Sequence, residues 1–104
     1  MINGIAGVGI LGLGKSLPEK VLTNFDLEKI VDTTNEWIVK RTGISRRRLL
    51  GENQPLYELG VEAANNAIID AGLTAREIDL IIVTTETPDY LAPNMACIIQ
   101  GKIG

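Results

Sequence analysis

The sequence predicts an α/β fold, and three of its features carry that prediction. A glycine-rich apolar segment over 2–13 suits a strand, because its Ile and Val residues are branched at Cβ. Residues 56–71 repeat apolar side chains at three- and four-residue steps, the spacing of a helix face. The run 79–85 is almost continuously apolar and has the length of a buried parallel strand. A helix followed by such a strand is half of a βαβ unit.

The first predicted strand also contains a Gly-x-Gly-x-x-Gly pattern over 7–12, which is typical of dinucleotide-binding loops. In those loops the glycines follow the strand and open a helix directly. Here residues 15–18 (Lys-Ser-Leu-Pro) continue as a loop. We therefore favour a strand whose glycines allow another backbone to approach closely.

Two short helices are expected next. Thr23-Asn24 precedes the segment 25–31, whose acidic residues lie in the first turn, as a helix N-terminus prefers. Residues 33–36 (Thr-Thr-Asn-Glu) are a second start signal, for a helix over 37–42 that ends at Gly43. The basic stretch 44–50 alternates in part, and 51–55 has the composition of a turn.

The helix over Leu56–Ala71 has an alanine-rich face and Gly72 as its terminator, so it can pack closely against a neighbouring element. A last helix is expected over 94–103, after Pro93. Two strands and one long helix cannot cover a parallel strand on both faces. We therefore expect these 104 residues to be part of a longer protein.

The composition excludes several kinds of site. The chain supports one domain at most, has no His and contains one cysteine, Cys97. These residues alone can form no Cys/His zinc site, no pairing of a nucleophile with an imidazole and no intrachain disulfide. The lone thiol favours the cytoplasm, and no apolar run approaches the ~18 residues that span a bilayer. Met1 to Leu13 lacks the basic region of a signal peptide, so we expect it to be mature sequence.

Residues 32–44 (Asp-Thr-Thr-Asn-Glu-Trp-Ile-Val-Lys-Arg-Thr-Gly-Ile) closely resemble the amino-terminal part of β-ketoacyl-acyl-carrier-protein synthase III, which starts type II fatty-acid synthesis. The likeness runs through essentially the whole chain. It implies a thiolase-like fold, with five α-β-α-β-α layers when complete, that pairs as a homodimer. Residues 1–104 would be the opening part of the first half, without the catalytic cysteine or the second half.

The resemblance implies an acyltransferase. Its cysteine, assisted by His and Asn, takes an acyl group from acyl-CoA and condenses it with malonyl-acyl-carrier-protein, releasing carbon dioxide. None of these three residues falls within 1–104, so we expect this part alone to be inactive. CoA thioester is a substrate, and no cofactor, metal, membrane or nucleic-acid partner is expected. A related condensing enzyme of polyketide or quinolone synthesis and a self-contained CoA-binding module remain alternatives.

Trp37 and Arg41 lie four residues apart on one predicted helix, so their side chains share a face. An indole beside a guanidinium suits a nucleotide, because the ring stacks on a base while the cation faces a phosphate or the base. The resemblance assigns Trp37 to the adenine of CoA, with polar contacts from Thr33 and Arg41. From the residues alone, a core tryptophan beside a solvated arginine is the favoured alternative.

Half of the ten basic residues lie within nine positions, although the net charge is −3. An anionic partner and a plain solvated face explain this asymmetry equally well. The CoA phosphates, an acidic carrier protein or, least well, nucleic acid would suit such a cluster. The five residues are Lys40, Arg41, Arg46, Arg47 and Arg48.

Cys97 and Ala92 are the remaining candidates. Cys97 lies near a predicted helix N-terminus, a position that can favour a thiolate. Its apolar neighbours Ile98 and Ile99 predict burial and a structural role instead. By resemblance, Ala92 occupies the place of a Phe that reaches across the dimer into the partner's acyl pocket. A smaller side chain there predicts room for a longer or branched primer.

Overall fold

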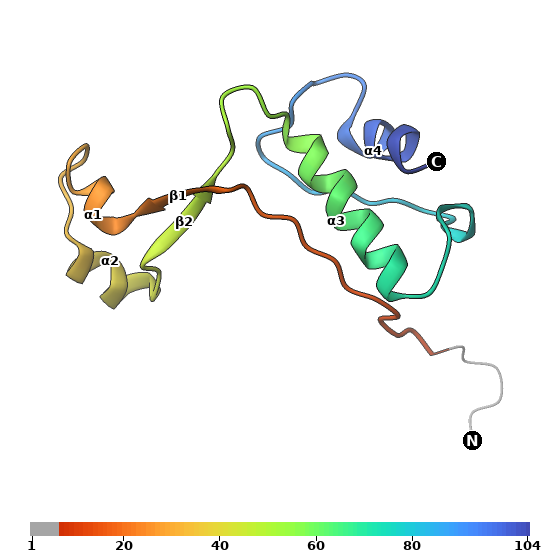
Figure 1. The fold of residues 1–104 in the computed structure, drawn as a ribbon, viewed down its shortest axis with the longest axis horizontal. Helices are drawn as coiled ribbons and strands as arrows, with labels where there is room; N and C mark the ends of the chain where they lie inside the picture. The colour runs from red at the N-terminus through yellow and green to blue at the C-terminus, as the bar shows by residue number, and fades with distance from the viewer. Residues whose placement is uncertain (1–6) are drawn as a thin grey trace. The chain divides into compact units, whose positions relative to one another are not determined.

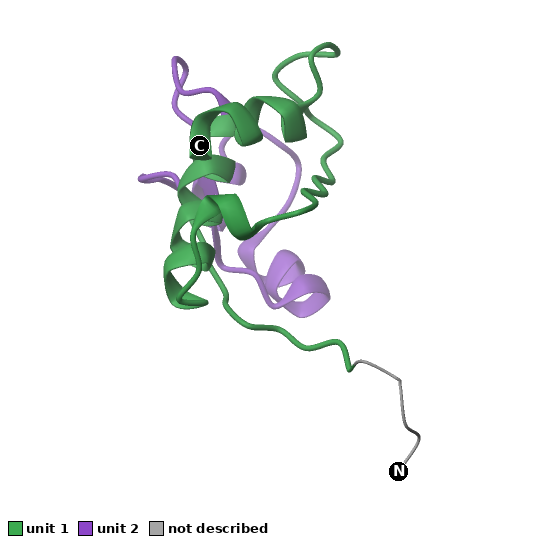
Figure 2. Cartoon of the chain, turned by 90° about the vertical axis from the view of Figure 1, so that its right-hand side faces the viewer, with its two compact units in different colours: residues 1–16, 57–104 green, residues 17–56 purple. Residues whose placement is uncertain are grey.

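The computed structural model describes residues 7–104, which form two compact units (Figure 2). Unit 1 comprises Met1–Ser16, described from residue 7 on, and Tyr57–Gly104, and unit 2 comprises Leu17–Leu56. The elements, shown in Figure 1, are β1 (Lys20–Thr23), α1 (Asn24–Leu27), α2 (Asn35–Thr42), β2 (Arg46–Leu49), α3 (Leu56–Asp70), the 3-10 helix η1 (Ala75–Glu77) and α4 (Met95–Ile103).

Unit 2 contains a two-stranded antiparallel sheet, in which Lys20 of β1 lies opposite Leu49 of β2. Thr23 ends β1 and caps α1, because its side chain accepts a hydrogen bond from the backbone N of Asp26 while the Asp26 carboxylate accepts one from the Thr23 backbone. The predicted helix over 25–31 is confirmed at its start, and backbone turns continue to Val31. β1 was not predicted.

α2 begins and ends near the residues that the sequence indicates. The Thr34 side chain accepts a hydrogen bond from the backbone N of Trp37 at 3.1 Å. Gly43 adopts a left-handed φ of 71° and donates its N–H to the Val39 carbonyl, which closes the helix. The predicted helix over 37–42 is therefore confirmed and begins two residues earlier.

In unit 1 the segment that precedes β1 lies directly on α3. A Cβ atom at Gly12 would lie 2.5 Å from the Ala67 carbonyl oxygen, and one at Gly14 would overlap the backbone of Ala63 and Ala67. Gly12 and Gly14 therefore allow the close backbone approach that was expected, here against an alanine-rich helix, whereas nothing lies within 4 Å of a Cβ atom at Gly7 or Gly9. Three hydrogen bonds hold the segment in place: Leu13 N to Asp70 Oδ2, Ser16 Oγ to Glu62 Oε2, and Asn66 Nδ2 to the Lys15 carbonyl.

Neither strand predicted for unit 1 is a strand in the structure. Residues 7–13 form no ladder, residues 2–6 of that prediction lie outside the described residues, and 79–85 also carries no strand. A strand requires a hydrogen-bonded neighbour, and β1 with β2 is the one sheet formed within 7–104. Leu80 and Ile82 are accordingly 73% and 78% exposed. The apolar pattern indicates that these residues favour burial, but it does not show whether another strand is present to pair with them.

The predicted helices 56–71 and 94–103 are confirmed as α3 and α4. Gly72 follows α3 with a φ of 68°, and Asn94 caps α4 by accepting a hydrogen bond from Cys97 N at 2.9 Å. Met95 and Ile99 are buried on one face of α4. None of the helices within 7–104 has both the length and the apolar character that a bilayer span requires.

Candidate functional site

Trp37 and Arg41 form one exposed pair on α2. The Arg41 guanidinium carbon lies 5.4 Å from the centroid of the Trp37 ring, within the range of a cation–π contact. Trp37 is 56% exposed, so the core tryptophan favoured from the residues alone is wrong. An indole has two faces, and Arg41 occupies only one of them. The arrangement leaves aromatic surface on which a planar base can stack.

The local sequence explains why Trp37 points outward. Ile38, its neighbour on α2, is buried, and successive residues of a helix point about 100° apart. The Thr34 cap fixes the first turn at the Trp37 backbone N–H. α2 therefore anchors itself through Ile38 and presents Trp37 and Arg41 to solvent.

Thr33 and Ala92 are the other two predicted site residues. Thr33 is half-buried and lies two residues before the first residue of α2, so it belongs to the approach to the Trp37 end of that helix. Ala92 is exposed and is followed by a cis peptide bond to Pro93. The contact of Thr33 with CoA and the place of Ala92 in an acyl pocket stay predictions.

The basic cluster divides into two groups. The Arg47 guanidinium donates to Asn24 Oδ1 at 2.8 Å, and the Arg48 guanidinium donates to the carbonyls of Pro18 and Glu19 at 3.2 and 3.0 Å. These two side chains therefore link β2 to residues on either side of β1. Lys40, Arg41 and Arg46 are exposed, and no salt bridge within 7–104 involves them. Arg48 is also exposed, and hydrogen bonds to neutral oxygen atoms do not remove the charge of an arginine, so the cluster as a whole stays positive.

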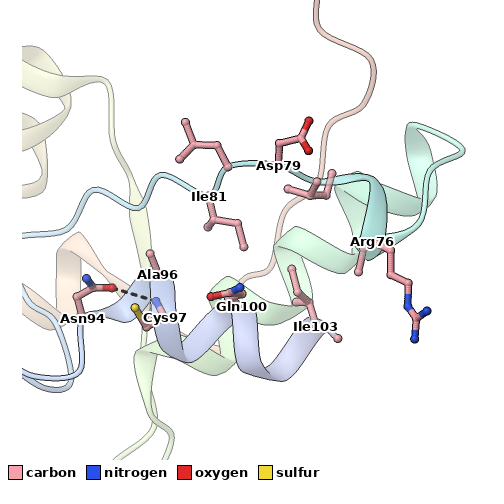
Figure 3. Close-up of a pocket in the computed structure, with 12 residues that line it drawn as sticks. Arg76, Asp79, Ile81, Asn94, Ala96, Cys97, Gln100 and Ile103 are labelled. Atoms are coloured by element: carbon pink, nitrogen blue, oxygen red, sulfur yellow. Dashed lines mark hydrogen bonds between the residues drawn. The ribbon is translucent and has the colours of Figure 1, made fainter.

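Cys97 lines a cavity of about 510 Å³ in unit 1, between α4 and the segment that begins at η1 (Figure 3). The expectation that Cys97 is buried is wrong, because the thiol is exposed. Met95 and Ile99 occupy the inward face of α4, and Cys97 lies two residues from each, where side chains do not share a face. The chain has no His, so no imidazole is available to this thiol.

Sequence reasoning did not anticipate this cavity. Its polar lining comes from Arg76, Asp79, Asn94 and Gln100, which belong to segments some twenty residues apart in the chain. The apolar character of 79–85 predicts a buried strand, so the sequence does not indicate a cavity beside this segment. Within the described part of the chain, no group of three His, Cys, Asp or Glu residues is arranged to hold a metal ion.

Comparison with known proteins gives the context of this site. No protein-family model matches the chain. It is 53% identical over 96 residues to the β-ketoacyl-[acyl-carrier-protein] synthase III of Caldanaerobacter subterraneus subsp. tengcongensis and 50% identical over 98 residues to that of Geobacillus kaustophilus. It matches the crystal structure of 3-oxoacyl-[acyl-carrier-protein] synthase III from Aquifex aeolicus with a TM-score of 0.87 and 47% identity. The chain is a homologue of part of synthase III.

The match covers 92–94% of this chain but only 29–32% of those synthase III sequences, and 31% of the solved Aquifex chain. The predicted partial thiolase-like α/β fold is therefore confirmed, as about a third of the synthase III structure. A further solved relative is the priming β-ketosynthase from the R1128 polyketide pathway. It matches with a TM-score of 0.84 and 34% identity over 91% of this chain and 28% of its own.

Proposed function

We propose that this chain is the part of an initiating condensing enzyme that recognises the adenine nucleotide of acyl-CoA. The enzyme would join the acyl group to malonyl-acyl-carrier-protein with loss of carbon dioxide, to give 3-oxoacyl-acyl-carrier-protein. The observation that carries the proposal is the exposed Trp37 ring with the Arg41 guanidinium 5.4 Å from its centroid. About 50% identity to synthase III supports the same reading.

Each residue of the pair has a distinct role in the proposal. The free face of the Trp37 indole stacks on adenine, an interaction worth about 1–3 kcal/mol for a base on an aromatic ring. The Arg41 guanidinium donates hydrogen bonds to a phosphate or to the edge of the base. The Thr33 hydroxyl adds a polar contact beside the first turn of α2. The reacting thioester lies at the other end of CoA, so these residues bind substrate without touching the bond that breaks.

The condensation itself needs groups from elsewhere in the enzyme. The chain has no His, so we assign the nucleophilic cysteine, the His and the Asn to polypeptide outside 1–104. Residues 1–104 would then be the opening part of the first thiolase-like half and inactive alone. The proposed enzyme is a cytoplasmic homodimer, in which the loop around Ala92 shapes the partner's acyl pocket.

A related polyketide-priming enzyme is the second candidate. The observation in its favour is the TM-score of 0.84 to the R1128 priming β-ketosynthase. Identity to that chain is 34%, against 53% to the Caldanaerobacter synthase III, so the fatty-acid role is preferred. The two candidates can be separated with the enzyme that contains this chain, by offering it two acyl acceptors in turn. Preference for a carrier protein of fatty-acid synthesis favours the first candidate, and preference for one of polyketide synthesis favours the second.

Calorimetric titration of the chain with CoA and with pantetheine tests the binding proposal. Pantetheine keeps the thiol arm of CoA but lacks the nucleotide. We therefore expect measurable binding of CoA and no measurable binding of pantetheine. Trp37→Ala should reduce the affinity for CoA by about tenfold or more, which is the loss of one stacked base. Equal affinities for CoA and pantetheine, or an unchanged CoA affinity in Trp37→Ala, would overturn the proposal.

A further inference from the structure

We infer that Asn24 is a positioning residue for the Trp37–Arg41 pair, because its side-chain amide holds both ends of the helix that carries them. The inference deepens the proposed function and rests on it for the identity of the ligand. The hydrogen bonds that carry it are independent of any ligand, so the positioning role can be tested separately.

Asn24 is completely buried, with 0% of its surface exposed. Its Nδ2 atom donates two hydrogen bonds, one to Asn35 Oδ1 at 2.9 Å and one to the Ile44 carbonyl at 2.7 Å. Asn35 is the first residue of α2, and Ile44 follows Gly43, the residue that closes it. The two N–H groups of one amide therefore reach the two ends of the same helix.

Asn24 is itself held firmly in unit 2. Its Oδ1 atom accepts a hydrogen bond from Arg47 Nη2 at 2.8 Å, and its backbone N donates to the Ser45 carbonyl at 3.1 Å. Every buried side-chain polar atom within 7–104 has a partner, so this network is complete. A satisfied buried network holds its members in one geometry, because breaking any bond leaves a desolvated polar group.

α2 depends on such outside support. It has eight residues, and isolated helices shorter than about 12–15 residues are marginal in water. Ile38 is its one buried residue. Trp37 lies two residues after Asn35, and Arg41 lies three residues before Ile44. Release of either end would therefore move one member of the pair relative to the other.

The test uses substitutions that remove single hydrogen bonds from the full chain. Asn24→Asp keeps an acceptor for Arg47 but removes both N–H donors that reach α2. Asn35→Ala removes the acceptor at the start of α2 only, whereas Asn35→Asp retains it and serves as the conservative rescue. Asp70→Asn weakens the acceptor for Leu13 N in unit 1, outside the unit that contains α2, and is the control.

Amide hydrogen exchange without ligand is the first readout. We expect exchange in α2 to be about tenfold faster in Asn24→Asp, the cost of one to two buried hydrogen bonds, while β1 and β2 keep their protection. Asn35→Ala should accelerate exchange at Trp37 and Ile38, and Asn35→Asp should restore it. If Asn24→Asp fails to fold, the Asn35 variants still decide the question.

Affinity for CoA is the second readout, with an expected loss of about tenfold in Asn24→Asp and none in Asp70→Asn. Wild-type exchange rates in Asn24→Asp would overturn the inference. So would equal effects of Asn35→Ala and Asn35→Asp, or faster exchange spread evenly over unit 2, which indicates a general structural role. If the unsubstituted chain does not bind CoA, the proposed function fails, and the exchange rates alone decide the role of Asn24.

Discussion

Arg41 lies against the indole of Trp37, with its guanidinium carbon 5.4 Å from the ring centroid, and both side chains are exposed. A cation–π contact at an exposed site contributes only about 0.5–1 kcal/mol to stability. Substitutions at either residue should therefore alter ligand binding much more than folding. The functional and structural roles of α2 can consequently be measured apart.

Arg41→Ala should weaken CoA binding by about tenfold and reduce its dependence on salt, because a charged hydrogen bond to the nucleotide contributes about 1.5–3 kcal/mol. Calorimetric titration at two salt concentrations measures both effects. Arg76→Ala makes the same change of charge in η1 of unit 1 and is the matched control. Equal losses of affinity in the two variants would indicate that only net charge matters.

Arg47→Ala should destabilise unit 2 by about 1–3 kcal/mol, because it leaves the buried Oδ1 of Asn24 without its donor. The adjacent Arg46 is exposed, so Arg46→Ala is the control and should change the free energy of unfolding by less than about 0.5 kcal/mol. Urea unfolding, followed by circular dichroism, measures both. If the two variants unfold at the same urea concentration, the hydrogen bond from Arg47 to Asn24 does not stabilise unit 2.

Gly14→Ala should destabilise unit 1 by about 1–3 kcal/mol or more, since the added methyl group would overlap the backbone of α3 at Ala63 and Ala67. Gly9→Ala is the control, because nothing lies within 4 Å of a Cβ atom there. Thermal unfolding of the two variants gives the comparison. A similar melting temperature in both would show that 12–14 does not pack closely on α3.

Asp26 should titrate well below an ordinary carboxylate. Hydrogen bonds from the Thr23 hydroxyl and backbone N, helped by Lys29, lower the pKa of Asp26 from 3.8 to about 2. Because the folded-state pKa is the lower one, the unfolded chain binds more protons in this range. The stabilisation is present above about pH 4 and is lost as the pH falls through about 2.

An NMR titration of the Asp26 carboxyl carbon checks that pKa directly. Thr23→Ala removes the hydroxyl donor and should raise the pKa of Asp26 toward its ordinary value. Asp26→Asn should flatten this part of the pH dependence of stability. A midpoint near 3.8 in the unsubstituted chain would contradict the capping geometry.

Local signals in the sequence predicted the helices well, because their ends depend on neighbours in the chain. Thr34 and Gly43 show this for α2: a hydroxyl that accepts from the first turn and a glycine with positive φ specify both ends. The Trp37–Arg41 pair followed from the four-residue spacing alone. Its exposure did not follow, since an isolated tryptophan favours the core, and only the family resemblance pointed to solvent.

The errors in strand prediction and the unforeseen role of Asn24 concern contacts between residues distant in sequence. β1 was missed because Lys20–Thr23 has only four residues, two of them polar, and its pairing with β2 joins residues more than twenty positions apart. The strand expected over 79–85 does not form, because no other strand within 7–104 pairs with it. Asn24 resembles an ordinary helix-start residue in the sequence. Its role depends on Asn35, Ile44 and Arg47, which only folding brings to it.

Trp37 is the only tryptophan of the chain, so its fluorescence reports directly on the proposed adenine contact. The most direct measurement is a titration of the chain with adenosine 3′,5′-bisphosphate, the nucleotide end of CoA, followed by Trp37 emission. Stacking on adenine predicts saturable quenching of Trp37, which Arg41→Ala should shift to a higher concentration of the bisphosphate. Emission that stays unchanged while calorimetry shows CoA bound would contradict the account.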